Sequence, residues 1–190
     1  MGNQQVHNWF GDITINRFNQ LIGLFTVVFV RGKNTLSTDE TIRYPEKATN
    51  SRFTFSFWAF PEEEYTRTLR AYFTFCQEYY RSKGYRCNMM NVGYRVNEDA
   101  SSLLSYSSGG TVMTIDPVST GDAGWEEFLV AYNDFCSQHG GVPLFNQTNS
   151  ITRSQVEKAF GERLVTFEGY RKRFDPSERL LNEYFRKLLK

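Results

Sequence analysis

The chain of 190 residues is long enough for one domain with a hydrophobic core, or at most two small ones. Its net charge of +1 gives no electrostatic basis for binding nucleic acid or an anionic membrane, so no nucleic-acid partner is expected. Aromatic residues make up 16% of the chain, and because they bury large areas they predict a dense core or an aromatic-lined pocket.

The chain begins with a segment, residues 1–51, that we call the lead-in segment. We predict that it is separate from a domain over residues 52–190. Phe18, Leu21 and Phe25 recur at helical spacing. The β-branched residues that follow them predict that this helix passes into an extended segment.

The apolar run over residues 20–30 is too short to cross a bilayer. Its apolar face predicts contact with another element, and pairing of two copies of the chain is one form that contact can take. The first five residues are polar and uncharged, so no signal peptide is expected. The three cysteines are far apart in the sequence and predict reduced thiols. We expect a cytoplasmic protein, with membrane association as an alternative.

Residues 52–60 alternate strictly, with Phe53, Phe55 and Phe57 on one side, and predict a strand with one apolar face. Pro61 opens a predicted helix that runs to about residue 82 and stops at Gly84. The buried face of this helix is predicted to carry Tyr65, Leu69, Tyr72, Phe73, Cys76, Tyr79 and Tyr80.

A strand is predicted over residues 85–96, followed by a hairpin of strands 102–106 and 111–115 around a Ser-Ser-Gly-Gly turn. Residues 124–139 form a predicted helix with apolar residues at three- and four-residue spacing. Two helices on one face of an antiparallel sheet give an α+β fold.

The chain ends in a predicted helical tail. Thr152 and Gln155 match a capping box at the start of a helix over residues 153–160, and Gly161 is expected to end it in left-handed conformation. Two more helices are predicted over residues 163–174 and 178–189.

Known catalytic motifs are missing. The sequence has no G-x-G-x-x-G or GxxxxGK[ST] loop for a nucleotide phosphate, and no G-x-S-x-G or HExxH. Of the two histidines, His139 ends a predicted helix, where a cation is favoured by the helix dipole. No metal site is predicted. The chain by itself therefore does not have the features of a complete enzyme.

The second half of the chain is similar to a known family. Trp125, Tyr132-Asn133 and Gly140-Gly141-Val142-Pro143 are followed by Arg173-Phe174-Asp175-Pro176 and Leu180-Leu181-Asn182-Glu183-Tyr184-Phe185. This series resembles the C-terminal end of the FAD-linked oxidases of the vanillyl-alcohol oxidase superfamily, in the aldonolactone oxidase branch.

The resemblance implies a cap (substrate) domain that covers the flavin of a separate FAD-binding domain, which this chain lacks. It implies hydride transfer from a CH–OH group of a small hydroxylated substrate to FAD. The Glu-x-Arg motif of the branch falls on residues 93–95, which keep only Arg95, and this arginine becomes the predicted catalytic residue. The branch's His-Trp-Gly-Lys motif falls on residues 144–147, which keep neither His nor Lys.

Five further residues are candidates for contacting the substrate. Asn146 and Gln147 carry hydrogen-bonding groups but no acid or base, and Tyr94, Tyr106 and Ser105 are weaker candidates. Structural roles remain open for all of them, and Arg95 as an ordinary surface residue of a strand is the alternative to a catalytic role. A stand-alone α+β binding module without catalysis is the alternative to an oxidase domain.

Overall fold

A computed structural model describes residues 14, 17–18, 20–21, 24–25 and 54–189. The chain divides into two compact units, residues 1–48 and 49–190. In the first unit every described residue is helical, as its spacing predicts, and the large apolar side chains among them are exposed. The predicted extended segment after this helix lies outside the described residues.

The second unit is organised by a four-stranded antiparallel sheet with the order β3-β4-β2-β6. Its strands are β2 (Trp58–Pro61), β3 (Arg95–Val96), β4 (Val112–Ile115) and β6 (Val142–Pro143). A separate antiparallel pair joins β1 (Thr54–Phe55) to β5 (Val118–Ser119).

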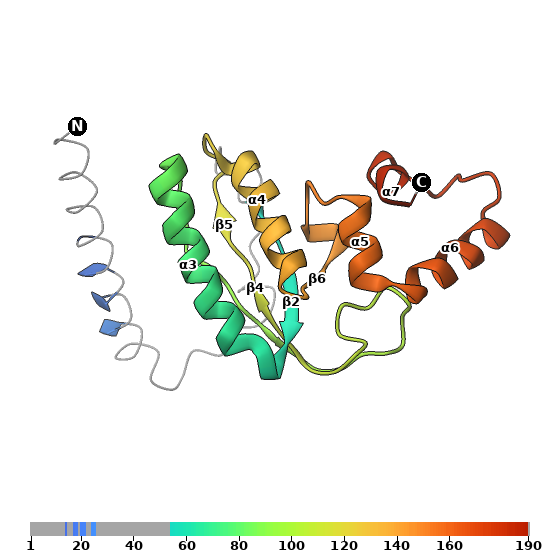
Figure 1. The fold of residues 1–190 in the computed structure, drawn as a ribbon, viewed down its shortest axis with the longest axis horizontal. Helices are drawn as coiled ribbons and strands as arrows, with labels where there is room; N and C mark the ends of the chain where they lie inside the picture. The colour runs from blue at the N-terminus through green and yellow to red at the C-terminus, as the bar shows by residue number, and fades with distance from the viewer. Residues whose placement is uncertain (1–13, 15–16, 19, 22–23, 26–53, 190) are drawn as a thin grey trace. The chain divides into compact units, whose positions relative to one another are not determined.

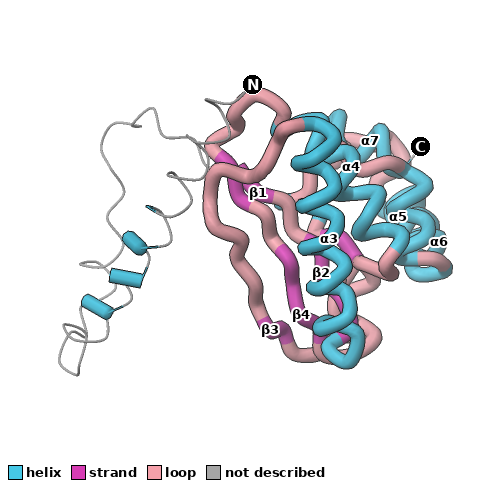
Figure 2. The backbone as a smooth tube through the Cα atoms, turned by 60° about the vertical axis from the view of Figure 1, so that its left-hand side comes forward, coloured by secondary structure: helices cyan, strands magenta, loops and turns pink. Residues whose placement is uncertain are grey.

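Two helices, α3 (Tyr65–Lys83) and α4 (Trp125–Gln138), lie side by side on one face of the four-stranded sheet (Figures 1 and 2). A 3-10 turn, Glu62–Glu64, leads into α3, and Gly84 ends that helix with φ +71°. We call this side the helix-covered face and the opposite side, which carries Phe57 and Ala59, the open face. The arrangement confirms the predicted α+β class.

The main core fills the space between the helices and the sheet. Trp58 and Phe60 of β2 are fully buried against Tyr72, Phe128 and Tyr132. The Trp58 indole also donates a hydrogen bond of 2.9 Å to Asn133 Oδ1, so its polar atom is satisfied inside the core. The high aromatic content of the sequence is thus used mainly to pack α3 and α4 onto the sheet.

The strand predicted over residues 52–60 is two short strands in different sheets, and it does not have a single apolar face. Phe57 and Ala59 are buried on the open face, while Trp58 and Phe60 are buried on the helix-covered face. Phe55 is 37% exposed. The side chains do alternate between the two faces, but in the second half of the segment the side chains on both faces are buried.

Two of the residues predicted for the buried face of α3 point elsewhere. Phe73 and Tyr80 are exposed, and Phe75 packs on the core instead, with its ring 5.0 Å from that of Phe135. The position of α4 decides this, because it meets the side of α3 on which Tyr72 and Phe75 lie.

The long strand predicted over residues 85–96 is reduced to β3 and one isolated bridge at Val92. The hairpin predicted before β4 was also wrong, because residues 102–106 form turns and β4 pairs with β2 and β3. Serines explain the turns, since the Ser105 hydroxyl accepts a hydrogen bond from the backbone N–H of Ser107 and competes with strand pairing.

The tail contains α5 (Arg153–Phe160), α6 (Glu162–Phe174) and α7 (Glu183–Leu189), after a 3-10 turn over Phe145–Gln147. The predicted capping box at the start of α5 is present with both of its hydrogen bonds. Gly161 ends α5 with φ +51° and ψ −130°, which is not the left-handed conformation that was expected.

The last helix is shorter than the predicted range, because the Asp175 carboxylate accepts hydrogen bonds from the backbone N–H groups of Arg179 and Leu180. These bonds fix a turn where the sequence pattern indicated a helix. Leu180, which lies within the predicted range of this helix, is 86% exposed.

Candidate functional site

The open face of the sheet carries a hollow of about 430 Å³. Residues from both sheets and from the turn after β6 line it: Phe55, Phe57, Val92, Tyr94, Asp116, Val118, Leu144 and Gln147. Most of the lining is apolar or aromatic, with a few polar groups among it. This combination fits a small organic ligand that has an apolar surface and a few hydrogen-bonding groups.

Phe57 holds the parts of the hollow together. Its carbonyl oxygen accepts hydrogen bonds from Leu144 N at 3.1 Å and from Thr148 Oγ1 at 2.7 Å, and these bonds fix the turn that carries Gln147. The Phe57 ring also lies 6.5 Å from the Tyr94 ring at an interplanar angle of 19°. Two segments far apart in the sequence therefore meet at one residue of the sheet.

Asp116 is the most unusual residue of this hollow. It follows β4 and is 4% exposed, and its backbone pairs with that of Val92. Its Oδ2 accepts a hydrogen bond of 3.1 Å from Thr114 Oγ1, while its buried Oδ1 has no hydrogen-bond partner. An acceptor left without a partner in the interior is costly, so a carboxyl oxygen in this position suits a ligand that donates a hydrogen bond to it.

Burial raises the pKa of Asp116 to about 7, and the hydrogen bond from Thr114 opposes this rise only in part. The titratable side chains packed near it are Tyr65 of α3 and Tyr132 and Cys136 of α4, and burial raises the pKa of each of these as well. They are therefore neutral around pH 7 and supply no positive charge that would stabilise the carboxylate.

Two of the predicted substrate contacts, Tyr94 and Gln147, line the hollow together with Asp116. Asn146 belongs to the same 3-10 turn as Gln147, but its side chain is exposed and does not line the hollow. The structure thus brings together two of the five predicted contacts.

Tyr106 and Ser105 lie beside the hollow, in the turns before β4. The Tyr106 ring packs edge-on against Phe57 at 5.3 Å and lines a second hollow, of about 330 Å³, on the open face. Ser105 is used locally, since its carbonyl accepts a hydrogen bond of 2.8 Å from Arg163 Nη1. Arg163 lines the second hollow as well, and burial lowers its pKa.

Arg95, the predicted catalytic residue, lies away from the hollow. It pairs with Met113 across the ladder, on the helix-covered side, and its guanidinium contacts Glu62 at 2.6 Å and 3.0 Å. These hydrogen bonds hold the pKa of Glu62 below its usual range. The structure does not bring Arg95 together with Tyr94 and Gln147, which line the opposite face.

Gly93, where the related oxidases carry the glutamate of Glu-x-Arg, also faces the helices. A Cβ atom there would lie 3.0 Å from the Thr114 carbonyl oxygen and 3.4 Å from the Tyr65 hydroxyl. A glutamate would therefore crowd the backbone of β4 and the Tyr65 side chain of α3 rather than enter the hollow. Among the residues that line the 430 Å³ hollow, Asp116 carries the carboxylate.

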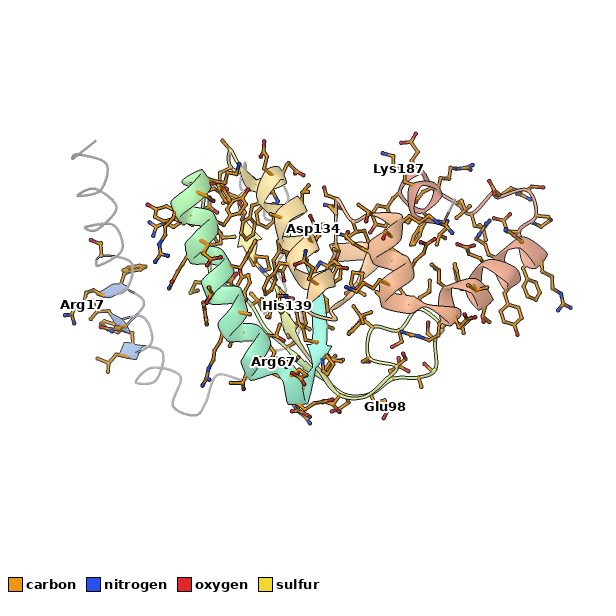
Figure 3. The ribbon with its side chains drawn as sticks, in the orientation of Figure 1. Arg17, Arg67, Glu98, Asp134, His139 and Lys187 are labelled. Carbon is orange, nitrogen blue, oxygen red and sulfur yellow. The ribbon has the colours of Figure 1, made fainter. Side chains whose placement is uncertain are left out.

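His139 follows the last residue of α4 (Figure 3), and its Nδ1 lies 2.8 Å from the Phe135 carbonyl oxygen. This contact caps the helix end, in keeping with the structural role that its position predicted. Cys136 is a buried free thiol whose pKa is raised by burial, which does not suit a nucleophile.

In the described part of the chain, no group of three or more His, Cys, Asp or Glu side chains is placed to hold a metal ion. Within the same residues, no helix is long and apolar enough to cross a membrane.

Sequence reasoning missed Asp116, which directly follows the strand predicted over residues 111–115 and precedes a proline. A usable signal existed in the alternation of Val112, Thr114 and Asp116, which puts a hydroxyl and a carboxylate on one face of β4. The sequence could not say whether that face would be covered by helices.

The fold and the hollow define an α+β domain with a ligand-sized site on the helix-free face of its sheet. The chain matches the D-arabinono-1,4-lactone oxidase family over residues 4–188, and it belongs to that family. It corresponds to the C-terminal domain of aldonolactone oxidase-like flavoenzymes, as the closing series of motifs predicted. No curated protein matched the chain.

Proposed function

We propose that this chain is the substrate-binding (cap) domain of an FAD-dependent oxidase that acts on a CH–OH group, and that its open face covers the flavin of an FAD-binding domain. The observation that carries the proposal is the hollow beside Asp116, on the one sheet face that no described helix covers. Membership of the D-arabinono-1,4-lactone oxidase family supports it.

The open face fits contact with the flat ring of a flavin, but it does not fit binding of the FAD phosphates. Phe55 and Val92 expose apolar surface at the hollow, where a flat ring can lie against them, and Asp116 offers an acceptor without a partner. A bound oxidised flavin supplies a two-electron acceptor that takes a hydride from the carbinol carbon as the alcohol becomes a carbonyl. The phosphates would be held by the FAD-binding domain.

The chain's own residues bind and orient the substrate. The Tyr94 hydroxyl and the Gln147 amide offer hydrogen bonds to substrate hydroxyl groups, and Phe57 and Leu144 exclude water from one side of the ligand. In this proposal the residues around the edge of the hollow are Tyr106, Ser105 and Asn146. The catalytic role of Arg95 stays a prediction from the family motif. The ion pair between Arg95 and Glu62 favours a structural role instead.

The test is to combine the full chain with the FAD-binding domain that accompanies it and to follow flavin absorbance anaerobically after adding D-arabinono-1,4-lactone. We expect the lactone to bleach the flavin only when both parts are present. Gln147→Ala should raise the KM about tenfold by removing one substrate hydrogen bond, whereas Gln138→Ala, on the exposed end of α4, should leave it unchanged.

A chain that is monodisperse, binds no FAD-binding domain and does not promote flavin reduction would favour the alternative, a stand-alone binding module. Sedimentation of the same chain also tests whether two copies pair through the lead-in segment.

A further inference from the structure

We propose that Asp116 binds the reacting hydroxyl group of an uncharged substrate in the 430 Å³ hollow and accepts its proton. This inference rests on the proposed function, and it names both the proton acceptor and the charge of the substrate.

The sheet holds the Asp116 carboxyl group in a fixed orientation beside the hollow. Asp116 is 4% exposed and uses only Oδ2, toward Thr114, while Oδ1 is buried without a partner. Thr114 is itself held in place, because its Oγ1 accepts a hydrogen bond of 2.9 Å from Tyr94 N. The carboxyl group is therefore oriented by the sheet beside the hollow, and one of its oxygens is engaged by no protein group.

A substrate CH–OH group that is oxidised to a carbonyl releases a proton as well as a hydride. When the hydroxyl O–H bond breaks, the proton goes to Asp116 and neutralises the carboxylate, while the C–H electron pair leaves as a hydride to the oxidised flavin of the proposed function. A carboxylate in an interior without a cation favours its protonated form, so accepting the proton removes an unfavourable charge. Tyr65, Tyr132, Cys136 and Tyr94 are the titratable groups around it, and none of them is cationic.

The charges that line the hollow restrict the substrates that it can bind. None of the residues that line the hollow is cationic, and its only charged group is the carboxylate of Asp116. A second anion would be repelled there and would find no counter-charge. The hollow therefore fits a neutral hydroxylated ring such as a lactone, and it disfavours the open-chain carboxylate of the same sugar acid or a sugar phosphate.

The binding half of the proposal is tested on the full chain alone, by NMR of its 13C-labelled aspartate carboxyl groups, with the Asp116 signal assigned from Asp116→Asn. D-Arabinono-1,4-lactone should shift the Asp116 signal and its titration midpoint, whereas D-arabinonate, above that midpoint, should not. An unchanged Asp116 signal at saturating lactone, or an equal effect of the aldonate, would overturn the proposed site.

The catalytic half is tested in the complex with the FAD-binding domain. Asp116→Asn should slow flavin reduction by about 10²- to 10⁴-fold without releasing the flavin. The wild-type rate of flavin reduction should rise as the pH passes the titration midpoint of Asp116, and this rise should be absent in the variant. Asp99→Asn removes the same charge from an exposed loop and should change neither.

Should Asp116→Asn fail to fold, the pH dependence of the wild-type complex still decides: a reduction rate that does not rise through the Asp116 midpoint overturns the proton-acceptor role. Wild-type rates in a folded Asp116→Asn variant also overturn that role. A wild-type complex that holds flavin but is not reduced by the lactone refutes the oxidase function instead, and the NMR result then decides separately whether Asp116 binds the ligand.

Discussion

The two faces of the four-stranded sheet are built from the same strands but serve different purposes. On the helix-covered face, Trp58 and Phe60 are fully buried, and the Trp58 indole N–H donates a hydrogen bond to Asn133 Oδ1. On the open face, the neighbouring residue Phe57 borders a hollow, and Asp116 keeps an oxygen without a partner. The Trp125 indole nitrogen of the helix-covered core also lacks a partner, so what distinguishes Asp116 is that its unpartnered carboxylate belongs to a residue that lines a hollow.

The largest expected effect compares one side chain on each face. Phe60→Ala should lower the free energy of unfolding by about 3–5 kcal/mol, because the cavity lies in the closed aromatic core. Phe57→Ala should cost about half as much, since Phe57, although only 6% exposed, belongs to a smaller cluster and borders the hollow. Urea denaturation of both variants gives the comparison, and equal losses would contradict the distinction between the faces.

A second comparison adds a methyl group instead of removing a ring. A Cβ atom at Gly141 would lie 2.8 Å from Phe60 Cε1 and 2.9 Å from the Cys136 carbonyl oxygen. Gly141→Ala should therefore lower the free energy of unfolding by about 1–3 kcal/mol through overpacking of the helix-covered face. Gly109→Ala is the matched control, because a Cβ atom there meets nothing within 4 Å. Thermal unfolding of the two variants should separate them clearly.

The pH dependence of stability sharpens the comparison on the open face. The pKa of Asp116 is about 7 in the folded chain, against an ordinary value of 3.8. The folded state therefore holds a proton that the unfolded state releases, and stability falls as pH rises through this window. Asp116→Asn should remove this loss and raise the free energy of unfolding above the window by about 1–3 kcal/mol.

The measurement for Asp116→Asn is denaturant unfolding at a series of pH values across the window. Asp99 provides the contrast, since its pKa is lowered by hydrogen bonds from Ser101 and its replacement should not remove the loss of stability at higher pH. A variant as pH-dependent as the wild type would show that Asp116 is not held in its protonated form by the fold.

The smallest expected effect concerns Arg95. Because its guanidinium is exposed and engages Glu62 on the helix-covered side, Arg95→Ala should reduce flavin reduction in the complex far less than Asp116→Asn does. Glu62→Ala should match Arg95→Ala in stability, as expected for two partners of one ion pair. A loss of reduction rate as large as that of Asp116→Asn would restore the catalytic role predicted from the family motif.

Local signals in the sequence were sufficient for α3, α4 and the start of α5, but not for the start of α7. The apolar spacing over residues 124–139 predicted α4, Gly84 marked the end of α3, and Thr152 with Gln155 formed the predicted capping box. These signals act within a few residues of one another, so they do not depend on the rest of the fold.

The short strands and the candidate site depended on contacts that no local pattern contains. Tyr94, Asp116 and Gln147 come together because β4 pairs with β2 and because Thr148 binds Phe57, a residue 91 positions away. The sequence by itself determined the α+β class, the helical elements and the family of the chain. Only the tertiary structure decided which face of the sheet stays open, since that depends on where the helices pack, and with it which carboxylate is available to a ligand.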